Sequence, residues 1–371
     1  MRIAYIITWN LGHNDGVTRK VLRQAKEWKD LGHQVEIFCA TEEIVKPVKG
    51  VTFFKKDRVW SSVFAAFKNR KIYNTLCDEV MSYSPDLVYL RWEFHKSPLS
   101  KLMKKIPTII EINTFFQGEF KRRSKENWIE RIRYWYYLLT YKKFDKFCSG
   151  FVSVCKEYLE LGQYKKLDKP YCYIPNSIPV DKDQKPVDYL ARDSSIPRLV
   201  FISSGIQPWH GLNNLIELAE KTVGDLEFDL ITGFDAGFLE FPENIKVYPF
   251  LEKDEFLEVF KNSVAGIGSA GLYENGMNEA CVLKVREYLS AGLPVIVPYK
   301  DTAFLDNKPP EWFLELPNEP SSLAKNKDEI IEFVSKMRGL RVQTNEVVPY
   351  ISSERWESER VNFFKKVLKL N

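Results

Sequence analysis

The chain has 371 residues and a net charge of +4, which allows two domains with separate cores but decides no partner by itself. It is 44% hydrophobic and 28% charged, as globular proteins are, and no apolar run approaches the roughly 20 residues that span a bilayer. Six scattered cysteines without a CxxC pair predict reduced thiols in a cytoplasmic protein, and the four histidines show no metal-ligand spacing.

The first 40 residues predict a strand, a helix and a second strand. Residues 2–8 form a short apolar strand, and the polar residues that follow at once argue against a signal peptide. A helix is expected over 17–30 and a strand over 34–40. Together they make a βαβ unit, which implies a parallel sheet with helices on its faces.

The loop that joins this strand to the helix contains Gly12, His13, Asp15 and Gly16. Its glycines let the backbone turn sharply or come close to a ligand. The spacing is not the dinucleotide fingerprint, because it lacks G-x-G-x-x-G and no acidic residue ends the second strand. Two interpretations stay open, a ligand loop and a simple tight turn.

Further strands are expected at 51–54, 86–91, 107–113 and 150–154. Arg91, Glu111 and Asn113 fall at the carboxyl ends of two of them. Ligands of open α/β sheets bind outside these ends, so we expect the three side chains near a ligand.

The segment 121–146 carries nine basic and three acidic residues. It predicts an amphipathic helix with Ile129, Ile132, Tyr136 and Leu139 on one face and further Trp and Tyr residues beside it. Such a helix suits an anionic membrane surface, which would place the protein on the inner face of a membrane. Packing on its own domain with a solvated basic face is equally open. Nucleic-acid binding is disfavoured, because no recognised motif accompanies the charge.

The stretch 181–197 is rich in Pro, Asp, Lys and Ser, so we expect a linker there between domains at 1–180 and 198–353. The second half repeats the βαβ plan. Strands are expected at 198–203, 227–232, 245–248 and 264–268, with helices at 212–221 and 254–261.

The segment 278–298 is the most informative of the chain. Glu279 and Glu287 are separated by seven residues, and a short helix over 283–289 leads into a buried strand at 294–297. Both carboxylates face one side only if Glu279 lies just ahead of the first turn. The free amides at the helix start attract an anion, which would explain Lys284 in the first turn. Two acids around an anion site suit a nucleotide-sugar, although a surface helix with solvated side chains is the alternative.

This segment resembles the donor-site signature of the retaining glycosyltransferases of family 4, which have the GT-B fold. The matching residues are Glu279, Glu287, Ala291, Gly292, Pro294 and Val295. Other landmarks follow in order, so the resemblance covers nearly the whole chain. It implies an α/β protein of two Rossmann-like domains, whose parallel sheets face an interdomain cleft. It also implies that the last helix, within 354–371, packs back on the first domain.

The resemblance implies a role for several residues. Glu279 would hold sugar hydroxyls and stabilise the developing cationic ring, and Glu287 would bind the ribose. Relatives carry Arg and Lys in the loop where this chain has Gly205, Gln207 and His210, so Lys284 must neutralise the diphosphate or His210 must be protonated. Further donor contacts are expected from Cys281, Val282, Leu283, Tyr248, Phe250 and Asn176. The acceptor side would use His13, Asp15, Gly16, Arg91 and Asn113, the last where many relatives have a histidine.

The predicted function is retaining transfer of a hexose-type sugar from a UDP-sugar to a saccharide or lipid-linked acceptor in polysaccharide or glycolipid synthesis. No metal, other cofactor or nucleic acid is expected. One alternative is another GT-B enzyme, such as an epimerase or a phosphorylase. The sequence shows neither the acid/base residues that an epimerase needs at the sugar nor a lysine site for the pyridoxal phosphate of a phosphorylase. The other is a non-catalytic two-domain sugar-binding protein, which the basic surface and the missing signal peptide disfavour.

Overall fold

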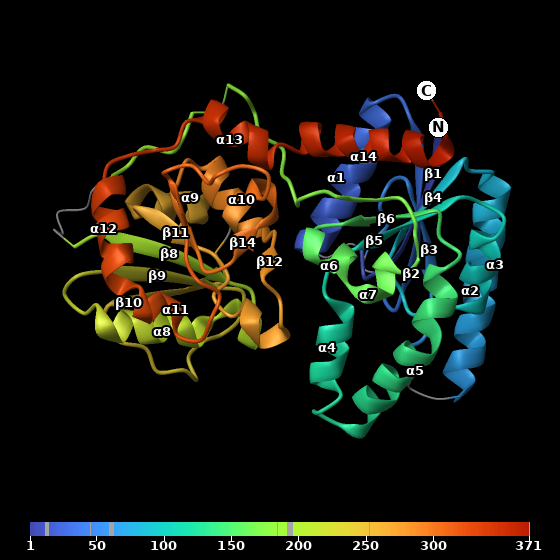
Figure 1. Ribbon diagram of the computed structural model, residues 1–371, viewed down its shortest axis with the longest axis horizontal. Helices are drawn as coiled ribbons and strands as arrows, with labels where there is room; N and C mark the ends of the chain where they lie inside the picture. Colours follow the sequence, from blue (N-terminus) through green and yellow to red (C-terminus); the bar gives the residue numbers. More distant parts are fainter. Residues whose placement is uncertain are drawn as a thin grey trace. The chain divides into compact units, whose positions relative to one another are not determined.

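The computed structural model describes residues 1–11, 15–44, 46–58, 63–183, 185–190, 196–251 and 253–370. The chain forms two compact units (Figure 1). The first contains Met1–Ile174 and the returning segment Glu354–Asn371, and the second contains Pro175–Ser353. No helix within the described ranges is long and apolar enough to cross a bilayer.

The first unit is built on a seven-stranded parallel sheet in the order β3-β2-β1-β4-β5-β6-β7. The central strands are short, apolar and buried, as expected for a sheet that is covered on both faces. The strands are β1 (Arg2–Thr8), β2 (Gln34–Thr41), β3 (Val51–Lys55), β4 (Leu87–Arg91), β5 (Thr108–Ile112), β6 (Gly150–Ser153) and β7 (Tyr171–Tyr173).

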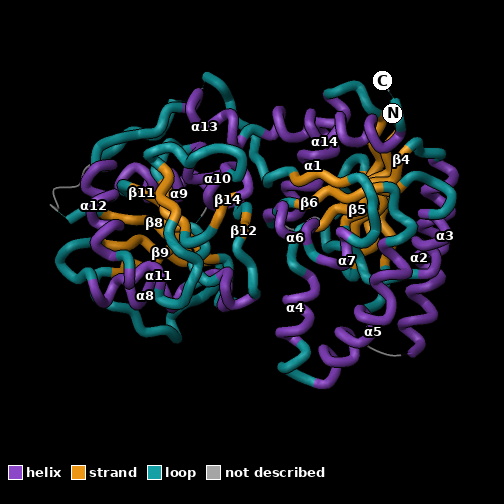
Figure 2. The backbone as a smooth tube through the Cα atoms, viewed as in Figure 1, coloured by secondary structure: helices purple, strands orange, loops and turns teal. Residues whose placement is uncertain are grey.

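Helices surround this sheet (Figure 2). They are α1 (Gly16–Asp30), α2 (Val63–Tyr83), α3 (Ser97–Met103), α4 (Phe116–Arg123), α5 (Trp128–Asp145), α6 (Lys156–Glu160), α7 (Gly162–Lys165) and α14 (Ser353–Leu368). Tyr5, Trp28, Tyr89 and Phe364 form an aromatic cluster that joins the sheet to α1 and α14. The last helix therefore belongs to the core of the first unit.

The basic segment 121–146 is not the single helix that its composition predicts. It is divided between α4 and α5, with a break over 124–127. Asn127 starts the second helix, because its side chain accepts a hydrogen bond from the amide of Glu130 and so satisfies one of the free donors at the helix start.

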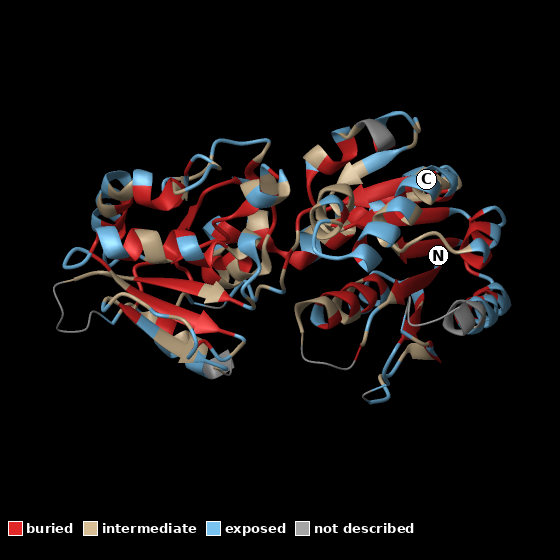
Figure 3. Cartoon of the chain, turned by 90° about the horizontal axis from the view of Figure 1, so that it is seen from below, coloured by how far each residue is buried: buried red, intermediate tan, exposed pale blue. Residues whose placement is uncertain are grey.

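The second unit contains a six-stranded parallel sheet in the order β10-β9-β8-β11-β13-β15 and a two-stranded parallel sheet, β12-β14. Figure 3 shows the central strands of both sheets as buried, whereas the helices that cover them have both buried and exposed residues. The strands are β8 (Arg198–Ser203), β9 (Glu227–Thr232), β10 (Ile245–Pro249), β11 (Ala265–Ile267), β12 (Glu279–Ala280), β13 (Val295–Val297), β14 (Lys300–Asp301) and β15 (Phe313–Glu315).

The helices of the second unit are α8 (Leu212–Lys221), α9 (Lys253–Asn262), α10 (Leu283–Ser290), α11 (Ser322–Lys325), α12 (Lys327–Met337) and α13 (Thr344–Ile351). Three short 3-10 helices complete it, η1 (Pro208–His210), η2 (Leu272–Asn275) and η3 (Thr302–Phe304). Two parallel sheets with covering helices confirm the predicted α/β class.

The boundary between the units lies at Ile174 and Pro175, earlier in the chain than the stretch predicted as a linker. Residues 185–190 of that stretch run along the second unit. The amide of Val187 donates to the carbonyl of Ala291, and the amide of Leu190 donates to the carbonyl of Lys261. Main-chain hydrogen bonds therefore attach this segment to the domain that it precedes.

Candidate functional site

The turn that contains Glu279 comes just ahead of α10, as the spacing of the two carboxylates requires. Glu279 lies in β12, which pairs with β14, and Val282 is the extended N-cap residue of the helix. Val282 offers no side-chain cap, and the first turn of α10 holds no acidic residue. The amides of Leu283 and Lys284 therefore begin a helix without a capping side chain, which is the arrangement that binds anions.

Lys284 is folded back against β8 from the first turn of this helix. Its Nζ donates to the carbonyl oxygen of Ile202 at 2.7 Å and lies 4.2 Å from the ring centroid of Phe201. Burial lowers the pKa of the Lys284 ammonium to about 7. One turn later, Tyr288 accepts a hydrogen bond from the amide of Ile202 at 2.8 Å. The helix is thus fixed at the carboxyl end of β8, where ligands of such sheets bind.

His210 is the second unusual group at this strand end. Burial, and then the positive charge of Lys284, lower the pKa of the imidazole to about 4. The ring is neutral near pH 7, and its buried Nδ1 has no hydrogen-bond partner among the described residues. A neutral imidazole next to a lysine supplies a hydrogen bond to an anion rather than a second charge. The structure thus brings together two of the predicted catalytic residues.

The loop of His210 is held rigidly. The carbonyl of His210 accepts a hydrogen bond from the amide of Ala270 at 3.1 Å. Gly211 follows with a φ of +79°, and a Cβ there would come within 2.5 Å of the Ala270 backbone. Only glycine fits this close approach without strain.

A buried polar network braces the turn before α10. Asn176 donates through its amide to Cys281 Sγ at 2.9 Å and through Nδ2 to the Cys281 carbonyl at 2.6 Å. Arg286 donates from Nε to the Asn176 carbonyl at 3.0 Å and forms a buried ion pair with Asp301. Arg286 and Asp301 were not predicted, because no local pattern marks a charge pair 15 residues apart.

This network changes the interpretation of Asn176 and Cys281. Both were expected to contact the donor, but their polar atoms hold the turn together. Burial raises the pKa of the Cys281 thiol to about 11, so the sulfur is neutral. Of the side-chain oxygen and nitrogen atoms of Asn176, Oδ1 is buried and has no partner among the described residues.

Other predicted donor residues lie at the ends of neighbouring strands. Gly205 accepts from Ser203 Oγ at 2.7 Å, and the Gln207 side chain is folded so closely over it that a Cβ on Gly205 would lie 2.3 Å from Oε1. Tyr248 is half-buried at the end of β10. Phe250, with a φ of +55° and an exposed ring, donates its amide to the Thr232 carbonyl. That amide is already used, so a base contact there would need the carbonyl group.

The predicted acceptor residues at the start of α1 have ordinary structural roles where the structure describes them. Asp15 is the N-cap of the helix and accepts from the amide of Thr18 at 2.8 Å and from Trp9 Nε1 at 3.2 Å. A capping carboxylate already occupies this helix start, which therefore does not suit an anion. Gly16 is the first residue of α1, and His13 lies outside the described residues.

Arg91 and Asn113 meet in a charged cluster that the sequence only partly indicated. Glu111 is completely buried, and Lys20 Nζ lies 3.0 Å from its Oε1 and 2.8 Å from Asn113 Oδ1. Arg91 Nη1 lies 3.6 Å from Glu111 Oε2, and Nη1 of Arg360 in α14 lies 3.7 Å from Oε1. Burial opposes ionisation of Glu111, but these three cations hold its pKa well below the usual range.

Among the described residues, no group of His, Cys, Asp and Glu side chains is arranged to hold a metal ion. The triplet Asp181-Lys182-Asp183 has the spacing of a metal-binding Asp-x-Asp motif, but it is an exposed turn in which the amide of Asp183 donates to Asp181.

Comparison with solved structures places this geometry in a known architecture. Sucrose-phosphate synthase from Thermosynechococcus elongatus superposes with a TM-score of 0.70 at 11% identity, covering 99% of each chain. The lipopolysaccharide outer core galactosyltransferase WaaB gives 0.66 at 13% identity, covering 99% of this chain and 100% of that one. HepE of Anabaena, solved with UDP and glucose, gives 0.61 at 12% identity with the same coverage.

The chain has the GT-B fold. No protein-family model and no curated protein matches its sequence. The GT-B prediction from the sequence is confirmed, and identities of 11–13% extend the likeness no further than the fold.

Proposed function

We propose that this GT-B protein is a glycosyltransferase that moves a hexose-type sugar from a UDP-sugar to an acceptor with retention of configuration and without a metal ion. The observation that carries the proposal is the start of α10. There the helix has no side-chain cap, the charge of Lys284 acts on the unpartnered imidazole of His210, and Glu279 comes just before the helix. Structural neighbours that are glycosyltransferases, one of them solved with UDP and glucose, support it.

The leaving diphosphate is stabilised in this proposal by groups already fixed in place. The amides of Leu283 and Lys284, the Lys284 ammonium and the His210 ring supply hydrogen bonds to the oxygens on which charge develops. Glu279 binds sugar hydroxyls and stabilises the positive charge on the ring as the glycosidic bond loosens. Glu287, just over one turn into α10, takes the ribose hydroxyls.

We further propose that the acceptor is a saccharide or a lipid-linked sugar, bound by the first unit, and that the segment 121–146 lies on an anionic membrane surface. The exposed indoles of Trp128 and Trp135 support this part, because Trp and Tyr concentrate at membrane interfaces.

A panel of nucleotide-sugars, incubated with the protein in EDTA, tests the function. Slow hydrolysis of one UDP-sugar that releases the sugar with its original anomeric configuration is expected, and Glu279→Ala should lower that rate at least 100-fold. Glu220→Ala, which removes a carboxylate from an exposed position on α8 outside the proposed site, is the comparison variant and should change the rate less than twofold. Activity that requires a divalent cation, or an inverted product, contradicts the mechanism.

The sugar-binding alternative gives a different result in the same samples. A non-catalytic binding protein would be stabilised against heat by a free sugar and not by UDP. An epimerase would return the nucleotide-sugar with a changed hydroxyl configuration, which nuclear magnetic resonance detects directly.

A further inference from the structure

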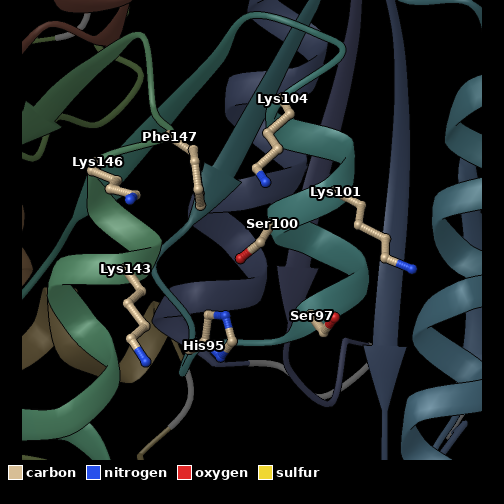
Figure 4. A pocket seen from close by; sticks show the side chains of 8 residues that line it. All are labelled: His95, Ser97, Ser100, Lys101, Lys104, Lys143, Lys146 and Phe147. Carbon is tan, nitrogen blue, oxygen red and sulfur yellow. The ribbon is translucent and has the colours of Figure 1, made fainter.

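A basic pocket opens in the first unit between α3 and the carboxyl end of α5 (Figure 4). It has a volume of about 360 Å³, and its lining includes Ser100, Lys101, Lys104, Lys143, Lys146 and Phe147. None of these residues belongs to the donor site, and no step of the proposed transfer uses them.

The charge of this pocket is not neutralised. Within the described ranges, none of its four lysines lies within 4.0 Å of a carboxylate oxygen. Lys104 and Lys146 lie on either side of one ring, with their Nζ atoms 4.5 Å and 5.0 Å from the centroid of Phe147. The adjacent Asp145 adds no negative charge at neutral pH, because burial raises its pKa to about 8. The pocket is therefore strongly positive.

Ser100 supplies a second, independent observation. The residue is 8% exposed, and its Oγ has no hydrogen-bond partner among the described residues. Figure 4 shows this hydroxyl directed from α3 into the space toward α5. Lysines at helix ends are common because of the helix dipole, but a buried hydroxyl without a partner is costly and indicates a ligand.

The surface of α5 leads directly to this pocket. Trp128, Ile132, Trp135 and Leu139 follow one another at helical spacing on one face of α5, and they are 69%, 44%, 63% and 68% exposed. The same spacing continues into Lys143 and Lys146 at the end of the helix. This exposed stripe is apolar over three turns and ends in the lysines of the pocket.

We propose that the pocket binds the phosphate of an anionic phospholipid headgroup while the exposed stripe of α5 lies in the membrane interface. Phosphate oxygens accept hydrogen bonds from ammonium groups and from the Ser100 hydroxyl, and the apolar stripe matches the acyl boundary beside the headgroups. A free phosphate ester would fill the pocket but leave the stripe exposed, so the lipid accounts for both features. The inference deepens the membrane part of the proposed function and rests on it, but it does not depend on the donor site.

Sedimentation of the full-length protein with phosphatidylcholine vesicles that contain phosphatidylglycerol tests the proposal. Lys104→Ser with Lys146→Ser should weaken binding about 25-fold, at about fivefold for each lysine near an anionic surface. Ser100→Ala keeps every charge and should still weaken binding about tenfold, because it removes one hydrogen bond to a charged group. Lys29→Ser with Lys366→Ser removes the same charge from exposed positions on α1 and α14 and should change binding less than twofold.

The outcomes separate the two levels of the proposal. This inference fails if the pocket variant and the Lys29/Lys366 variant lose membrane binding equally, or if Ser100→Ala binds like wild type. Either result would mean that diffuse positive charge, and not this pocket, binds the membrane. If the wild-type protein does not sediment, the membrane part of the proposed function fails with it. If glycerol 3-phosphate in solution binds the pocket but vesicles do not, the occupant is a soluble phosphate ester, which also overturns the lipid assignment. Thermal unfolding of each variant confirms that it is folded.

Discussion

Lys284 is a cation whose charge depends on what lies beside it. Its Nζ donates to one carbonyl oxygen and lies against the ring of Phe201, and burial of this group lowers its pKa to about 7 from an ordinary 10.5. A bound diphosphate would raise that pKa again, because an opposite charge favours the ionised form. Binding therefore takes up a proton at any pH between the two values.

This linkage predicts how UDP affinity depends on pH. Affinity should fall as pH rises above 7, at about tenfold per pH unit while a full proton is taken up. Lys284→Met should bind UDP at least tenfold more weakly at pH 6.5 and lose the dependence. Lys336→Met, at a surface position on α12, should keep it. Calorimetry in metal-free buffer from pH 6 to 9 measures both, and a pH-independent wild type would count against the assigned role.

The raised pKa of Asp145 predicts a pH effect on the stability of the fold rather than on ligand binding. Burial raises its pKa to about 8 from 3.8, so the folded protein holds a proton that the unfolded chain has already released. The free energy of unfolding contributed by this group is complete below pH 3.8 and is lost as pH rises toward 8.

Asp145→Asn removes that loss without changing the shape of the side chain. The variant should exceed wild type in unfolding free energy by about 5 kcal/mol at pH 8 and match it near pH 4. Asp78→Asn, on the exposed face of α2, should change stability by less than about 0.5 kcal/mol at either pH. Urea unfolding of wild type and Asp145→Asn at both pH values tests this prediction. An equal stability difference between the two proteins at pH 4 and pH 8 would contradict it.

At the scale of elements, α10 depends on a buried ion pair that lies behind it. Arg286 and Asp301 are both inaccessible to solvent, and Arg286 also reaches the Asn176 carbonyl. The pair fixes the turn that carries Glu279, so its loss should disturb the geometry of the site as well as lower the stability of the protein.

Breaking one side of this pair should be more harmful than removing both charges. Arg286→Met leaves the Asp301 carboxylate buried without a cation and should lower the free energy of unfolding by about 3–5 kcal/mol. Adding Asp301→Asn, which keeps the acceptor for the amide of Ala303, should restore at least half of that loss. Denaturant unfolding of the single and double variants measures this coupling, and additive losses would show that the charges are not paired in solution.

Regular elements were predictable where periodicity and end signals agree. The helix at 212–221 and the strand at 227–232 have the bounds that the sequence predicts, because Gly211 precedes the helix and an apolar run fills the strand. The helices α2 and α13 were not predicted. The first is apolar and basic around its circumference, and the second contains Pro349, so neither shows a clear stripe.

The candidate site was predictable only where local sequence carries it. Glu279, Lys284 and Glu287 could be placed from their spacing, since they share one short helix and the turn before it. The pairing of Lys20 with Glu111, or of Arg286 with Asp301, joins residues that are far apart in the chain. Such contacts depend on the packing of whole elements, which no single window of sequence contains.

At the scale of the whole molecule, each unit has its own parallel sheet and its own group of residues with unusual charge or burial. The second unit has an uncapped helix, the half-buried Lys284 with a lowered pKa and a neutral imidazole at one strand end. The first has a charged cluster around Glu111 and the basic pocket beside α5. The proposed function requires such a separation, with the donor bound by the second unit and the acceptor or membrane by the first.

Hydrogen exchange of the main-chain amides, with and without UDP in metal-free buffer, tests the central claim most directly. UDP should slow exchange at 282–285 and 205–211, because these amides face or support the diphosphate, while 97–103 in the first unit should not change. Protection that is absent from 282–285, or that is confined to other segments, would contradict the assignment of the donor site to the start of α10.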